Sequence, residues 1–214
     1  MNTVLTFPGI SSKDYGKNIV RLTRSNKDDP STEFLNNLDS RRISVVDFDS
    51  VKDDLDKLRD SDGKNMQKLK SVDAFFRSFD GKFYFIEFKK STSEALNKIG
   101  ENVEYDEKER IDVSFRKKAF DSITLSGITT TQDIIGSELM KNAVLIVVYK
   151  SSPNDAISAV EFNSSLTSRA NGRKCAIQYP IQWKLDELKS AGLYSDVHTW
   201  PDNKFESWVP DHLK

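Results

Sequence analysis

Residues 72–90 read VDAFFRSFDGKFYFIEFKK, in which two runs rich in aromatic side chains flank Asp80-Gly81. Asp-Gly is a frequent turn pair, and runs of aromatic and β-branched residues are typical of strands. The sequence therefore predicts a β-hairpin, with one strand over Val72–Phe79 and the other over Phe83–Lys90.

The second strand of this hairpin places two charges on one face. Glu87 and Lys89 are two residues apart, so both side chains project to the side that also carries Phe83 and Phe85, about 7 Å from each other. Burial of either charge is unfavourable unless the charge is paired or bound to a metal. The pattern therefore indicates either a cross-strand salt bridge at a sheet edge or a metal site.

The length of the hairpin loop decides whether Asp73 joins these charges. With a two-residue loop, Asp80-Gly81, Asp73 would pair with Phe88 and face the opposite side of the sheet. A loop one residue longer, with its glycine in the left-handed region, pairs Asp73 with Glu87 instead. Two carboxylates so placed can hold Mg²⁺ and leave positions for water and phosphate oxygens. A metal site therefore requires the three-residue loop or a β-bulge.

An Asp followed by Glu-x-Lys on the next strand resembles the PD-(D/E)xK nuclease superfamily, which includes restriction endonucleases, Holliday-junction resolvases and λ-type exonucleases. Val72 stands in the place of the family's often-absent proline, Asp73 matches its metal-binding Asp, and Glu87-Phe88-Lys89 matches its (D/E)xK. The resemblance covers about twenty residues closely. It implies an α/β fold with a restriction-endonuclease-like αβββαβ core, in which helices flank a mixed central β-sheet.

The resemblance also implies a reaction, the hydrolysis of phosphodiester bonds in DNA. In that scheme Asp73 and Glu87 hold Mg²⁺ or Mn²⁺, while Lys89 orients or helps to deprotonate the attacking water. Many members carry an upstream helical Glu, and Glu33, the only glutamate before the hairpin, takes that role here. Many also act as dimers, so we expect a homodimer. Two alternatives stay open: a non-catalytic scaffold that binds nucleic acid or protein, and an RNA-directed nuclease or toxin.

Helical periodicity appears on both sides of the hairpin. Apolar residues from Phe48 to Leu58 predict a helix that begins near Asp47-Phe48-Asp49 and ends at residues 60–63. Residues 111–123 repeat an apolar side chain every fourth position and carry a basic flank on the helix, formed by Arg116, Lys117 and Lys118. Such a flank is often only solvated surface, but it could also track a phosphate backbone.

The remaining elements are predicted from shorter signals. The run AVLIVVY, residues 143–149, is typical of a strand that is covered on both faces at the centre of a sheet. We also expect strands near 175–179 and Val197, and helices over 31–38, 181–191 (ended by Gly192) and 205–209. A second Glu-x-Lys, Glu187-Leu188-Lys189, falls in a helix, where residues two apart cannot share a site.

Composition bounds the protein class. The chain has 214 residues, is 37% hydrophobic and has a formal net charge of −1, which fits one domain over 1–214 with an N-terminal appendage at 1–30. Near-neutral charge argues against binding of nucleic acid by overall positive charge, although a local basic groove is compatible with it. A single cysteine and two histidines exclude an internal disulfide and a Cys/His zinc cage. Because no apolar run reaches membrane-spanning length and no signal peptide is recognisable, we expect a cytoplasmic protein.

Overall fold

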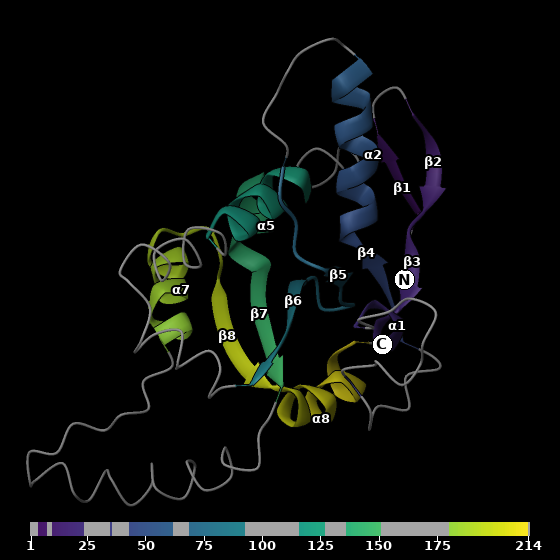
Figure 1. Ribbon diagram of the computed structural model, residues 1–214. Coiled ribbons are helices and arrows are strands. Elements are labelled where there is room, and N and C mark those ends of the chain that lie inside the picture. The colour runs from purple at the N-terminus through teal and green to yellow at the C-terminus, as the bar shows by residue number, and fades with distance from the viewer. Residues whose placement is uncertain are drawn as a thin grey trace, which may run out of the picture.

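The chain forms two sheets, with helices on both faces of the larger one (Figure 1). The computed structural model describes residues 4–7, 10–23, 35, 43–61, 69–92, 116–126, 136–150 and 180–213. The predicted α/β class and the mixed sheet flanked by helices are confirmed. Within these ranges, no helix combines the length and apolar character needed to cross a membrane.

The larger sheet has six strands in the order β3-β4-β5-β6-β7-β8. Their bounds are Gly16–Asn18 for β3, Ser44–Asp47 for β4, Ala74–Arg77 for β5, Phe83–Thr92 for β6, Ala143–Lys150 for β7 and Asp196–Pro201 for β8. Neighbours from β3 to β6 pair antiparallel, whereas β6, β7 and β8 run parallel. The smaller sheet pairs β1, Val4–Phe7, with β2, Ile10–Asp14.

Helices cover both faces of the six-stranded sheet and bury two apolar cores. One face carries α2 (Phe48–Ser61), a helix over 116–126, α5 (Gly136–Asn142) and α7 (Pro180–Ser190). The other carries α1 (Ile19–Leu22) and α8 (Asp202–His212). We refer to these as the Phe85 core and the Ile86 core, after the two fully buried residues of β6 that point into them.

The hairpin has the three-residue loop that a shared site requires. Ala74 pairs with Ile86 and Arg77 with Phe83, and the Ser78 backbone N–H donates to the Lys82 carbonyl at 2.9 Å. Gly81 has φ +84°, in the left-handed region that glycine adopts without strain. The predicted register is therefore confirmed, and continued by one residue it sets Asp73 opposite Glu87.

Several other elements match their sequence patterns. All seven residues of the run 143–149 are buried, and β7 is an interior strand of the sheet. The helix predicted from Phe48 onward is α2. Helix α7 ends before Gly192, as predicted. Gly192 has φ +72°, and its N–H donates to the Lys189 carbonyl at 3.0 Å, which closes the helix. The final helix α8 is longer than the predicted 205–209.

The N-terminal region contributes more to the fold than its sequence indicates. Tyr15 lies in the Phe85 core, while Ile19 and Val20 lie in the Ile86 core, and all three belong to the segment expected as an appendage over 1–30. Neither β4 nor α5 was predicted from the sequence. The helix expected over 31–38 and the strand expected over 175–179 lie outside the described residues, apart from the buried Leu35.

Candidate functional site

Asp73 joins three elements at the point where β5 begins. Its backbone carbonyl accepts a hydrogen bond from the N–H of Phe48 at 3.2 Å, at the junction of β4 and α2. Its carboxylate Oδ2 accepts from the N–H of Phe88 on β6 at 2.6 Å. Because this carboxylate bonds to the Phe88 N–H, β5 starts at Ala74 and not at the predicted Val72. The aspartate is therefore held on the side of Glu87.

Glu87 is a buried carboxylate with two lysine partners. Its side chain is 2% exposed. Lys118, from the helix over 116–126, places its Nζ 2.8 Å from Oε1 and 3.0 Å from Oε2. Lys89, two residues along β6, places its Nζ 2.8 Å from Oε1. These pairs compensate the charge of Glu87, because a buried charge without any partner is strongly destabilising. The structure therefore brings Asp73, Glu87 and Lys89 together, and adds Lys118 to them.

The electrostatics of the site follow from this crowding of charge. Burial, and then repulsion by Glu87, raise the pKa of Asp73 to about 7, although Lys118 and the Phe88 N–H act in the opposite direction. Burial lowers the pKa of the Lys118 ammonium, but attraction and hydrogen bonding to Glu87 outweigh burial, so that this pKa is raised. The site thus contains a carboxyl group with a pKa near neutral pH beside Lys118, an ammonium whose pKa is raised.

Asp49 is a further acidic residue of this region, which the sequence placed at a helix start but not near Asp73. It lies in the first turn of α2 and accepts a hydrogen bond from the hydroxyl of Ser71. Its charge contributes to the raised pKa of Asp73 and to that of Lys118. The segment Asp47-Phe48-Asp49 does start a helix, as predicted, with Asp47 Oδ1 accepting from the Ser50 N–H at 3.2 Å. Strand β4, which the sequence did not predict, leads directly into α2 and so positions this helix start near Asp73.

The three residues of the predicted basic flank form ion pairs with different acidic residues. Arg116 Nη1 is 3.1 Å from Oε2 of Glu187 on α7, and Lys117 Nζ is 2.9 Å from Oδ2 of Asp121 on its own helix. Of the three, only Lys118 forms an ion pair with Glu87. The three residues of the flank thus have three different partners. Glu33, the fourth residue of the expected catalytic set, lies outside the described residues.

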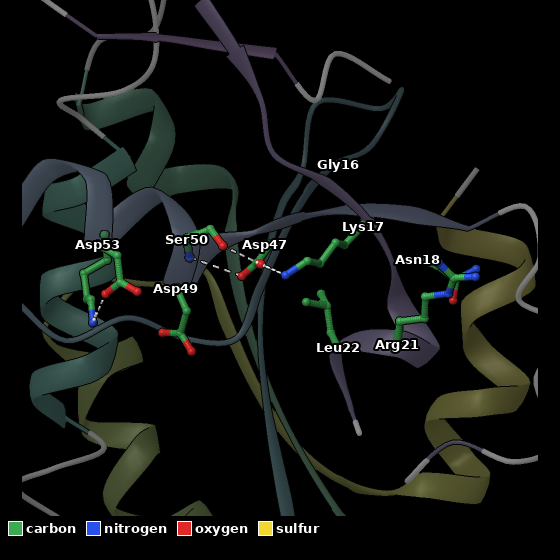
Figure 2. A pocket seen from close by; sticks show the side chains of 10 residues that line it. Gly16, Lys17, Asn18, Arg21, Leu22, Asp47, Asp49, Ser50 and Asp53 are labelled. Atoms are coloured by element: carbon green, nitrogen blue, oxygen red, sulfur yellow. Dashed lines mark hydrogen bonds and ion pairs between the residues drawn. The ribbon is translucent and has the colours of Figure 1, made fainter. Parts of the chain in front are cut away.

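A polar cavity of about 570 Å³ adjoins this region (Figure 2). It lies between β3–α1 and the start of α2. Figure 2 shows Lys17 and Ser50 pointing toward Asp47, with Asp49 on one side of this group and Arg21 on the other. Asp49 therefore belongs both to the cavity wall and to the surroundings of Asp73. The full lining is Gly16, Lys17, Asn18, Arg21, Leu22, Asp47, Asp49, Ser50, Lys52 and Asp53.

Comparisons with known proteins add nothing to the geometry: no family model, curated protein or solved structure matches the chain. Across the described ranges, no three His, Cys, Asp or Glu side chains are grouped so as to hold a metal ion. Asp73 and Glu87 supply carboxylate oxygens, the ligands that Mg²⁺ prefers, and Mg²⁺ commonly binds through one or two carboxylates and several waters. The pair fits such an ion in ligand chemistry, provided that Glu87 is released by its lysines.

Proposed function

We propose that the chain is a divalent-metal-dependent nuclease that hydrolyses phosphodiester bonds in DNA. The observation that carries the proposal is the hairpin register, because it puts Asp73 on the same face as Glu87 and Lys89. A chance Glu-x-Lys has no reason to meet an aspartate across the hairpin. The raised pKa of Asp73 adds a second argument, because strongly perturbed carboxyl groups gather at functional sites.

The order of elements supports a restriction-endonuclease-like core. Strands β4, β5 and β6 are antiparallel neighbours, the helix over 116–126 follows β6, and β7 then pairs parallel to β6. This order is compatible with the βββαβ part of the αβββαβ pattern that the resemblance implies, with α5 as an additional helix before β7. One departure is α2, which is inserted between β4 and β5. A second is the helix that precedes β4 in the described residues, α1, which has only four residues.

The proposed reaction divides its tasks among few residues. A divalent ion held by Asp73 and Glu87 would supply Lewis acidity and a hydroxide at neutral pH. Lys89 is 31% exposed, and its ammonium would bind a phosphate oxygen or orient the attacking water. The cavity beside Asp49 is within the size range of small-molecule sites, and we assign it to a nucleotide next to the scissile bond. Lys17 and Arg21 would contact the phosphate there.

The scaffold alternative has one observation in its favour. Both oxygens of Glu87 are already bonded to Lys118, and one of them also to Lys89, so the buried carboxylate is neutralised without any metal. A protein that only binds a partner could retain this arrangement as a structural ion-pair network. The two functions therefore predict different results for loss of Lys89.

The deciding experiment is cleavage of supercoiled plasmid and of single-stranded RNA with Mg²⁺, Mn²⁺ or EDTA. We expect metal-dependent cleavage of DNA, and a fall of about 100-fold or more for Lys89→Ala, the size typical of losing a group that assists proton transfer. Lys189→Ala is the matched control, because Lys189 belongs to the second Glu-x-Lys. It lies on α7, and its Nζ is 2.9 Å from Oδ1 of Asp196 on β8. Absence of cleavage, or equal rates for Lys89→Ala and Lys189→Ala, would refute the nuclease. Cleavage of RNA alone would favour the RNA-directed alternative.

A further inference from the structure

Lys118 occupies the position that a cation at this site would need. Its ammonium contacts both oxygens of Glu87, at 2.8 and 3.0 Å, and it shares Oε1 with Lys89, whose Nζ lies 2.8 Å from that atom. Asp73 and Asp49 also attract it. Lys118 therefore combines a direct contact with both oxygens of Glu87 and attraction by two further carboxylates.

The position of Lys118 creates competition between like charges. A metal bound to Glu87 would have to share the carboxylate with an ammonium already in contact with both oxygens. Two positive charges at such short range repel each other strongly in a partly buried site, where solvent screens little. The side chain of Lys118 is 24% exposed and has a flexible four-carbon stem. It can therefore leave Glu87 by changing rotamers, without movement of its helix.

We propose that Lys118 is a built-in competitor for the metal, which balances the carboxylates in the metal-free protein and must swing away before a divalent ion binds. This inference rests on the proposed function, since it concerns the same ligands. Its consequence is a weakened affinity for the metal, so that the ion binds only when its concentration is high enough to displace the ammonium. In exchange, the buried Glu87 keeps a partner in the absence of metal.

The test is calorimetric titration of Mn²⁺ into the full-length protein at pH 7.5, with Lys118→Gln compared with wild type. Removing one positive charge should lower the Kd for Mn²⁺ about tenfold or more. Lys117→Gln is the matched control, because Lys117 is the preceding residue of the same helix and bonds to Asp121, and its Kd should equal that of wild type. Lys118→Arg keeps the charge and should not tighten binding.

A second measurement covers the loss of stability that the variant should suffer. In EDTA, Lys118→Gln should melt below wild type, because Glu87 loses a partner, and Mn²⁺ should raise its melting temperature more than that of wild type. If the variant is unfolded in EDTA, Mn²⁺ must restore the fold, and failure to do so overturns the inference. Wild type that binds Mn²⁺ as tightly as Lys118→Gln overturns the inference alone. Absence of Mn²⁺ binding in both proteins overturns the proposed function as well.

Discussion

Asp73 should make the protein less stable as the pH rises, and Asp73→Asn should remove this effect. The carboxyl group has an ordinary pKa of 3.8 and a pKa of about 7 in the folded chain. Between these values the unfolded chain releases its proton while the folded chain retains it, so rising pH favours unfolding. The contribution of Asp73 to stability is therefore fully present below about pH 4 and lost as the pH passes 7.

The size of the effect follows from the difference between these two pKa values. At 1.36 kcal/mol per pH unit, the change from 3.8 to about 7 corresponds to ~4 kcal/mol, an upper bound because Lys118 can move to screen the charge. Asparagine keeps an oxygen that can accept the N–H of Phe88 but has no charge to bury. We therefore expect Asp73→Asn to match wild type near pH 4 and to exceed it by up to ~4 kcal/mol at pH 8.

Urea unfolding in EDTA, at half-unit steps from pH 4 to pH 8, measures this difference directly. Asp80→Asn is the control, because the pKa of this exposed loop aspartate is shifted in the opposite direction. A hydrogen bond from the Ser78 hydroxyl lowers it, so Asp80→Asn should not be more stable than wild type at pH 8. The reasoning is wrong if Asp73→Asn is no more stable than wild type at pH 8, or if the gap between them does not change with pH.

Two further predictions concern the loop and the cavity. Gly81→Ala should lower the free energy of unfolding, measured in urea, by about 1 kcal/mol. The reason is the backbone φ of +84°, since a Cβ at this position would meet no atom within 4 Å. Gly81→Asn should lower the free energy of unfolding by less, and equal stability of all three proteins would contradict the strain argument. Arg21→Ala should raise KM for DNA about threefold to tenfold with kcat unchanged, as expected when the bound substrate and the transition state lose the same binding energy. An equal loss in kcat would place Arg21 nearer to the chemistry than the structure indicates.

The hairpin could be predicted because its signals are local. Strand alternation fixes the face of Glu87 and Lys89, and the same alternation gives the loop length that would bring Asp73 to that face. The run 143–149 is equally local, because an unbroken apolar strand needs cover on both faces. The sequence signal for each of these features lies within a short stretch of the chain.

The rest of the site depends on contacts that no local pattern records. Strand β4 has only four residues, too few to show a period, so Asp49 could be predicted at a helix start but not beside Asp73. Lys118 precedes the buried Ala119 and looked like one of three equivalent basic residues. Its distinct role arises from the packing of its helix against β6, which is a property of the tertiary fold.

The hydrogen bonds of Asp73 bear on the choice between an enzyme and a scaffold. Its backbone carbonyl would accept the Phe48 N–H whatever the side chain, and an asparagine could accept the Phe88 N–H through its amide oxygen. A purely structural role would therefore be filled at neutral pH by an amide, without the cost of a carboxylate placed near Glu87. A destabilising charge at a buried junction of several elements is typical of functional sites. The scaffold accounts for Glu87 and its lysines, but it leaves Asp73 unexplained.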